Sequence, residues 1–202
     1  MRRFFLCFVA LLGLTACGAE PVTAPPGAIA AARYVHDAPT SITLYTVINN
    51  NSGAGAHSGL LINASQRVMF DPAGTFKHPR VPETNDVHYG MTPRIVNFYI
   101  DYHARETFRV IEQTVLVSPG VAELVKQRAE AYGAVPKAQC SNSITTILSG
   151  VPGFESIGST WYPAKLSDRF GKLPGVTSRT ITDDDADKNH GVLLVQAGEA
   201  PI

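Results

Sequence analysis

The chain has 202 residues, and its 17 basic and 17 acidic side chains leave no formal net charge at pH 7. Binding to a phosphate backbone requires a stripe or cluster of basic residues, which this sequence lacks, so no nucleic-acid partner is expected. The length is sufficient for one domain with a sizeable hydrophobic core.

The chain begins with the features of an exported protein. Arg2 and Arg3 precede an apolar run, and the tetrapeptide Leu-Thr-Ala-Cys ends at Cys17. The run is far shorter than the roughly 20 residues that span a bilayer, and its flanks are typical of a secretory signal. The tetrapeptide resembles the bacterial lipobox, which implies a signal peptide over residues 1–16 and a diacylglycerol on the sulfur of Cys17. An ordinary signal with a chance cysteine is the alternative.

The same resemblance bears on location. Gly18, rather than Asp, follows the lipidated cysteine, and this favours the outer membrane over the inner membrane. Residues 17–40 are rich in Ala, Pro and Gly and predict a flexible tether between lipid and domain. We therefore expect a protein of the cell envelope whose membrane partner is reached through its lipid anchor.

Ordered structure is expected over residues 41–180 and begins with three strands. Residues 42–48 are mostly β-branched and aromatic, which favours a strand. Further strands are predicted over 57–62 and 67–71, and the short segment 63–66 joins them.

The rest of the domain mixes loops, strands and helices. Residues 75–93 are proline-rich and predict a long loop that could serve as a lid. Strands are predicted over 95–101 and 107–117. Helices are predicted from Pro119 to Gly133 with Ser118 as the N-cap, from Cys140 to Gly150, and over 163–170. The tail, 181–202, is expected to be loose or to add an edge strand. Together these elements predict an α+β domain, an antiparallel sheet with helices packed on one side.

Three residues in this plan form a candidate catalytic set. His57 begins a predicted strand, Asp71 ends the next strand, and Cys140 begins a helix. Thiol catalysis needs a thiolate, a base that manages its proton, and a group that holds the base in one tautomer. Because a helix N-terminus carries partial positive charge and unpaired N–H groups, it lowers the pKa of a thiol and offers an oxyanion site.

The loop length decides whether His57 and Asp71 can share a face of the sheet. If they are directly opposed, Ile62 faces Gln66 and Asn63-Ala64-Ser65 forms a three-residue loop, which is a common hairpin connection. A two- or four-residue loop would move Asp71 to the other face.

Each of these residues also has an ordinary structural explanation. A lone cysteine can be an inert buried thiol, a histidine at a strand start is often a partly exposed polar residue, and Asp before Pro-Ala-Gly is a common turn former. A thiol redox role is disfavoured because the mature chain has no resolving cysteine.

The remaining polar residues give weaker signals. The spacing of His78, His88 and His103 fits no compact zinc pattern, and no phosphate-binding glycine loop precedes a helix, so neither a metal nor a cofactor is expected. Three residues are candidates for lining a substrate site: Ser58, His78 and Asn142.

The order of these motifs resembles a known superfamily. A strand with His57 in the phrase HSGLLI, then a polar residue on the next strand, then Cys140 in CSNSITTIL is similar to the circularly permuted branch of the NlpC/P60 (papain-like) superfamily. That branch includes lecithin:retinol acyltransferase-like and YiiX-like proteins. The resemblance covers about residues 57–148 and implies a permuted papain-like fold with Cys140 as nucleophile, His57 as base and Asp71 as the less certain third member.

We therefore expect a lipid-anchored thiol hydrolase or acyltransferase. Its substrate would hold an amide or ester bond, for example in a peptide of peptidoglycan or in an acyl lipid. The alternative is a non-catalytic lipoprotein, a binding or scaffold module of the same fold.

Overall fold

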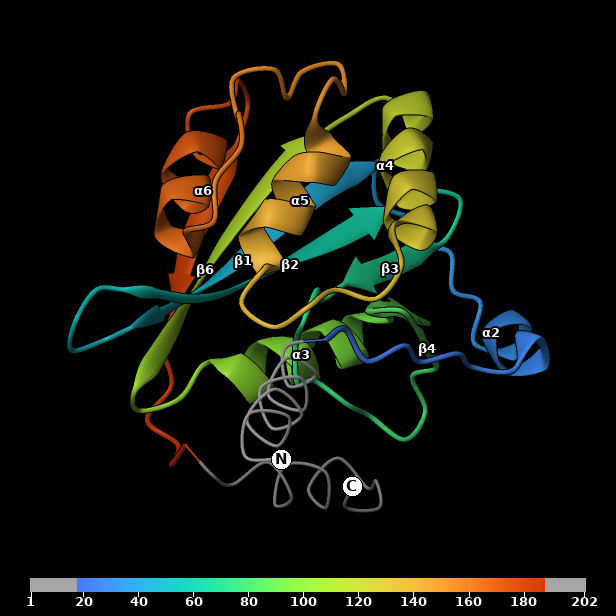
Figure 1. The fold of residues 1–202 in the computed structure, drawn as a ribbon, viewed down its shortest axis with the longest axis horizontal. Coiled ribbons are helices and arrows are strands. Elements are labelled where there is room, and N and C mark those ends of the chain that lie inside the picture. The colour runs from blue at the N-terminus through green and yellow to red at the C-terminus, as the bar shows by residue number, and fades with distance from the viewer. Residues whose placement is uncertain (1–17, 188–202) are drawn as a thin grey trace, which may run out of the picture.

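The structure is a computed structural model that describes residues 18–187. The predicted signal peptide, Cys17 and residues 188–202 of the predicted tail lie outside these residues. The described part is an α+β fold with a seven-stranded antiparallel sheet and five helices (Figure 1). None of the described helices has the length and apolar character needed to cross a membrane.

The sheet has the strand order β4-β5-β3-β2-β1-β6-β7. Its strands are β1 (Ser41–Asn49), β2 (Gly55–Asn63), β3 (Arg67–Phe70), β4 (Glu83–Thr84), β5 (Val87–Tyr89), β6 (Phe108–Leu116) and β7 (Thr177–Ile181). The central strand β1 is buried along nearly its whole length, as its β-branched and aromatic composition predicts. The predicted strands in the first half of the domain and the one over 107–117 are therefore present.

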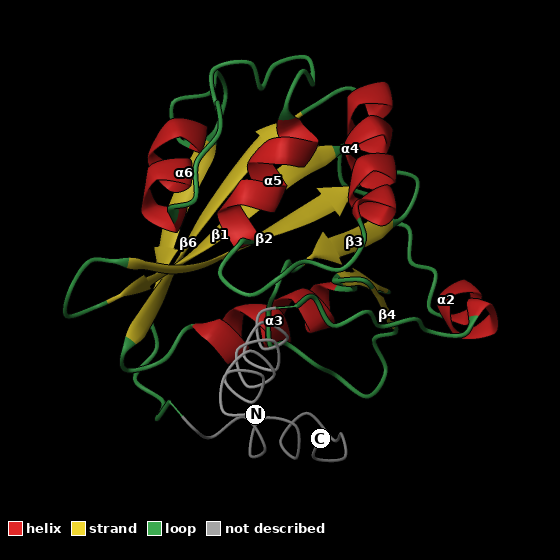
Figure 2. Ribbon diagram, in the orientation of Figure 1, coloured by secondary structure: helices red, strands yellow, loops and turns green. Residues whose placement is uncertain are grey.

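Helices cover both faces of the sheet (Figure 2). They are α2 (Pro26–Ala31), α3 (Pro93–His103), α4 (Pro119–Tyr132), α5 (Cys140–Leu148) and α6 (Pro163–Phe170). The helices α4, α5 and α6 share one hydrophobic core with Leu44, Leu60 and Ile62 of the sheet. On the opposite face, α3 shares a second core with Tyr45 and Leu61. The alternation of side chains along β1 and β2 supplies both cores.

Two helix boundaries follow the local signals of the sequence. The Ser118 hydroxyl accepts a hydrogen bond from the Val121 N–H at 3.3 Å, so Ser118 is the N-cap of α4. Gly133 ends this helix with φ 87°, a conformation that favours glycine. The predicted helices that begin at Cys140 and at residue 163 are also present.

The strand predicted over 95–101 is wrong, because these residues belong to α3. Their β-branched and aromatic composition favours a strand, but Thr92 caps a helix by accepting the Ile95 N–H, and Pro93 occupies the first turn. This helix lies on the face that was expected to be open, so the prediction of helices on one side only is also wrong.

Residues that were predicted as a tether and a long loop contact the sheet edge. Thr23 pairs with Thr84 of β4, and the Arg67 N–H donates to the Tyr34 carbonyl at 2.8 Å. Within the predicted loop 75–93, the chain forms β4 and β5. These contacts are largely backbone hydrogen bonds, which composition does not reveal.

Candidate active site

Cys140 is the first residue of α5 and the only cysteine among residues 18–187. It is a free thiol with 6 % of its surface exposed. The N–H groups of a first helical turn have no intrahelical acceptor and make this end of the helix positive. Two residues earlier, Ala138 has φ 64°, a backbone conformation that is uncommon for a residue other than glycine. The chain therefore turns sharply just before it presents the sulfur.

His57 lies near the start of β2, next to a β-bulge. Val47 pairs with His57, but the next residue of β1, Ile48, pairs with Gly55, so Ala56 is the extra residue. The alternation along β2 directs His57 and Leu61 to the face covered by α3, whereas Ser58 and Leu60 face α5. The His57 side chain is 15 % exposed.

Asp71 follows the last residue of β3 and is 1 % exposed. The His57 Nε2–H donates to its Oδ1 atom at 2.7 Å. The hairpin keeps a three-residue loop, but Asn63 pairs with Arg67 rather than Ile62 with Gln66. The register therefore differs by two residues from the one that would place His57 and Asp71 in direct opposition. A shift of two preserves the face of Asp71 and brings it diagonally to His57.

The sulfur and the imidazole meet at an open edge of β2. The pairing of β2 with β3 ends at Leu60 and Phe70, so among the described residues the start of β2 has no strand on this side. The N-terminus of α5 occupies this place: the hydroxyls of Ser58 and Ser141 are 3.2 Å apart, and the Cys140 sulfur lies 3.9 Å from the Ser141 hydroxyl. Figure 1 shows α5 lying over β1 and β2.

The ionisation of His57 and Cys140 is coupled. Burial opposes a charge on His57, but the negative charge and hydrogen bond of Asp71, with a smaller contribution from Cys140, raise the His57 pKa to about 10. Burial alone would raise the pKa of the Cys140 thiol, but hydrogen bonding and charge from His57, with the Ser58 N–H, lower it below its ordinary value. Both shifts act in the direction of a thiolate paired with an imidazolium.

The proton positions follow from the same contacts. Because His57 Nε2 donates to Asp71, Nδ1 is the ring nitrogen that remains for the thiol. Burial would raise the pKa of Asp71, but His57 holds it well below its ordinary range, so this residue is a carboxylate. Cys140, His57 and Asp71 therefore supply a nucleophile, a proton carrier and an orienting anion, in that order.

The three predicted substrate-lining residues lie in different surroundings. Ser58 is fully buried, and its hydroxyl lies 3.2 Å from that of Ser141, the residue after Cys140. Asn142 lies in the first turn of α5, where its carbonyl accepts the hydroxyls of Thr145 and Thr146. His78 is buried, and its ring packs edge-on against Phe98 of α3.

Two residues near the site were not predicted as functional. The Tyr99 hydroxyl donates to Asp71 Oδ1 at 2.6 Å, and the His103 ring stacks on His57 with a centroid distance of 5.6 Å. Both lie on α3, four residues apart, and therefore on one helix face. A correct helix prediction for this segment would have placed them together.

The positions of His57 and His103 bear on whether this site could bind a metal ion. One potential ligand atom from each of His57, Asp71 and His103 lies within 4.8 Å of the others. Imidazole and carboxylate are ligands that suit zinc. His88, whose spacing from His78 and His103 fitted no zinc pattern, lies on β5, where burial lowers its pKa to about 4.

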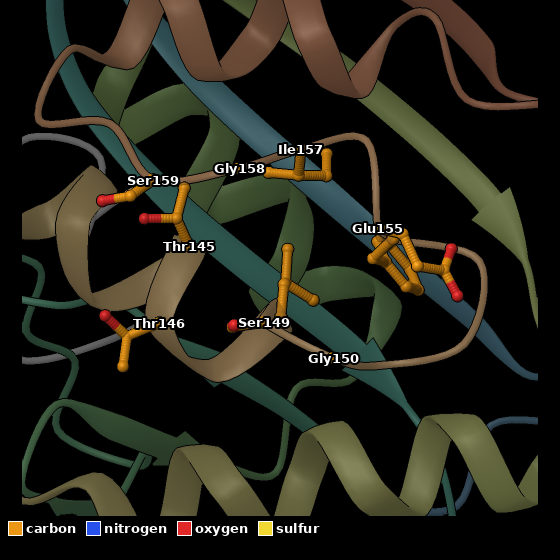
Figure 3. A pocket seen from close by; sticks show the side chains of 10 residues that line it. Thr145, Thr146, Ser149, Gly150, Glu155, Ile157, Gly158 and Ser159 are labelled. Atoms are coloured by element: carbon orange, nitrogen blue, oxygen red, sulfur yellow. The ribbon is translucent and has the colours of Figure 1, made fainter.

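A separate pocket of about 210 Å³ lies beside the C-terminal half of α5 (Figure 3). Its lining combines hydroxyl groups, as in Thr145, Ser149 and Ser159, with Phe154 and Glu155. Cys140 is at the opposite end of this helix, so the pocket is not part of the thiol site.

Comparisons of the chain with models of protein families, with curated proteins and with solved structures find no match. What the structure defines is therefore an α+β fold with an antiparallel sheet, and a Cys-His-Asp cluster at the open edge of β2.

Proposed function

We propose that this protein is a thiol hydrolase or acyltransferase of the cell envelope. Cys140 is its nucleophile, His57 its general base and acid, and Asp71 its orienting residue. The observation that carries the proposal is the hydrogen bond between His57 and Asp71, together with the mutual pKa shifts of His57 and Cys140. A lone inert cysteine has no need of such partners.

The proposed reaction has two steps. The Cys140 thiolate attacks the carbonyl carbon of an amide or ester, and the Cys140 backbone N–H stabilises the oxyanion. His57 gives its Nδ1 proton to the leaving group, which departs as an amine or alcohol. Water or another acceptor then attacks the thioester, His57 takes the proton of that acceptor, and the acyl product leaves with the thiolate restored.

The order of the elements supports a permuted papain-like arrangement as part of this proposal. The strand with His57 comes first, Asp71 follows the next strand, and the helix that begins with Cys140 comes last. These are the positions implied by the resemblance to the permuted NlpC/P60 branch.

The proposal places the enzyme at a membrane through a lipid on Cys17, with the outer membrane favoured over the inner membrane. Substrates at that location include the peptide amides of peptidoglycan and the esters of acyl lipids. The neutral overall charge is compatible with either class.

An electrophilic thiol probe tests the proposal. We expect iodoacetamide to label Cys140 in the folded protein near neutral pH at least about tenfold faster than it labels a free model thiol. The Cys140→Ala variant provides the background. Equal rates for Cys140 and the model thiol would favour the alternative, a binding or scaffold module without a reactive thiol.

The cluster of His57, Asp71 and His103 supports a second candidate, a metal-dependent hydrolase. In such an enzyme, a metal-bound water rather than Cys140 would be the nucleophile. The two candidates differ in what removes activity: alkylation of Cys140 in the first, and chelation of the metal in the second.

A further inference from the structure

One carboxylate oxygen of Asp71 accepts two hydrogen bonds. Its Oδ1 atom accepts the His57 Nε2–H at 2.7 Å and the Tyr99 hydroxyl at 2.6 Å. Asp71 and Tyr99 are each 1 % exposed. A carboxylate that is removed from water is costly unless donors replace the lost hydration, so the phenol stabilises the charge of Asp71.

Two glycines leave the space that the Tyr99–Asp71 contact occupies. A Cβ atom at Gly59 would lie 2.2 Å from the Tyr99 hydroxyl and 3.2 Å from Asp71 Oδ1. A Cβ atom at Gly74 would lie 1.7 Å from Asp71 Oδ2. Residues with a side chain at these positions would displace the carboxylate or the phenol, so the Tyr99–Asp71 contact depends on both.

The Tyr99 ring is held by aromatic neighbours. Its centroid is 5.7 Å from that of Tyr45, 5.1 Å from Phe76 and 4.4 Å from His103. Burial and the charge of Asp71 raise the pKa of Tyr99 well above its ordinary value, so the phenol stays protonated and can donate. Burial and the packing of the ring therefore hold the hydroxyl beside Asp71.

We propose that Tyr99 is a positioning residue of the thiol site, which holds Asp71 as a carboxylate with Oδ1 directed at His57. The inference rests on the proposed function and adds a fourth residue to the proposed triad of Cys140, His57 and Asp71. Tyr99 acts only through Asp71. Without the phenol, Oδ1 loses one of its two donors and is no longer held toward His57, which weakens the imidazolium–thiolate pair.

The test compares Tyr99→Phe with Tyr102→Phe. Both substitutions remove one hydroxyl from α3, but the Tyr102 hydroxyl donates to the carbonyl of Thr75 rather than to Asp71. The measurement is the rate of iodoacetamide labelling of Cys140 as a function of pH. In Tyr99→Phe we expect the acidic limb of the rate–pH profile to shift to higher pH by about one unit. The plateau rate at higher pH should stay within about twofold of the wild-type rate. Tyr102→Phe should follow the wild-type curve.

A second variant keeps the test decisive if Tyr99→Phe is poorly folded. Gly59→Ala retains the phenol but displaces it from Asp71, so the same shift of the acidic limb is expected. An unchanged limb in a folded Tyr99→Phe or Gly59→Ala variant overturns the inference, as does an equal shift in Tyr102→Phe. A wild-type thiol with ordinary reactivity instead overturns the proposed function, and this inference with it.

Discussion

The Nε2 atom of His57 lies 2.7 Å from Oδ1 of Asp71, although the pairing of their two strands ends before it reaches either residue. The early end of β3 has a consequence for chemistry. The edge of β2 is therefore open and leaves room for the N-terminus of α5. As a result, one ring nitrogen of His57 is bonded to the Asp71 carboxylate, and the other is left for the Cys140 thiol. The site therefore depends on where a strand stops.

Replacing the base tests the coupling between His57 and Cys140. His57→Gln removes the charge and hydrogen bond that lower the Cys140 pKa, while burial, which raises it, remains. We expect labelling of Cys140 near neutral pH to fall by about tenfold or more. His36→Gln is the matched control, because its ring contacts Tyr34 rather than the thiol site. Equal labelling in both variants would show that His57 does not act on the sulfur.

The ion pair of His57 and Asp71 predicts a pH dependence of stability, which is cleanest in Cys140→Ala because the coupled thiol is then absent. In the folded state Asp71 raises the pKa of His57 from its ordinary value of 6.5 to about 10, against the opposing effect of burial. The resulting stabilisation is complete below 6.5 and is lost as the pH rises through the raised pKa.

Denaturant unfolding over this alkaline range measures the effect. We expect the free energy of unfolding of Cys140→Ala to decrease with rising pH, and the added substitution Asp71→Asn to flatten that decrease. For Asp71 the sign is opposite: its pKa is depressed, so its contribution is present above 3.8 and is lost as the pH falls below that value. The same slope with and without Asp71 would contradict the ion pair.

The N-caps test the helix that replaced a predicted strand. Thr92→Ala removes the hydroxyl that accepts the Ile95 N–H, and Ser118→Ala removes the equivalent contact in α4. Each should lower the free energy of unfolding by about 1 kcal/mol. Thr92→Ser keeps a capping hydroxyl and should cost less. If Thr92→Ala has no effect while Ser118→Ala does, the start of α3 is wrongly placed.

Chelation separates the two candidate nucleophiles. If Cys140 is the nucleophile, treatment with EDTA leaves both its labelling rate and any hydrolytic activity unchanged. If the cluster of His57, Asp71 and His103 holds a catalytic metal, EDTA abolishes hydrolysis and added zinc restores it. Metal analysis of the purified protein provides the stoichiometry for either outcome.

The predicted lipid can be tested at the start of the mature chain. Mass spectrometry should find an N-terminal peptide that begins at Cys17 with an added diacylglycerol, and the protein should fractionate with membranes. In Cys17→Ser we expect the lipid mass to be lost and the protein to leave the membrane fraction. A mature N-terminus elsewhere would instead support an ordinary secretory signal.

Local signals in the sequence predicted much of the fold. The composition of β1, the Ser118-Pro119 start and Gly133 end of α4, and the apolar spacing of α5 each depend on neighbouring residues only. The segment 95–101 failed because side-chain composition and helix capping gave opposite signals, and packing against the second face of the sheet decided the outcome.

The candidate site was partly predictable for the same reason. Cys140 at a helix start and His57 on a strand are local features, whereas the diagonal approach of Asp71 depends on a register that loop length alone left open. Tyr99 could not be identified, because its contact with Asp71 requires α3 to lie beneath the sheet. That placement is a tertiary feature, and no short motif encodes it.

The central claim is that Cys140 is a thiolate stabilised by His57. Titrating the ultraviolet absorbance of the thiolate, as wild type minus Cys140→Ala, measures this directly. The account predicts an absorbance step below the ordinary thiol pKa of 9.0 and its movement to higher pH in His57→Gln. A step at or above 9.0 in the wild-type protein would contradict it.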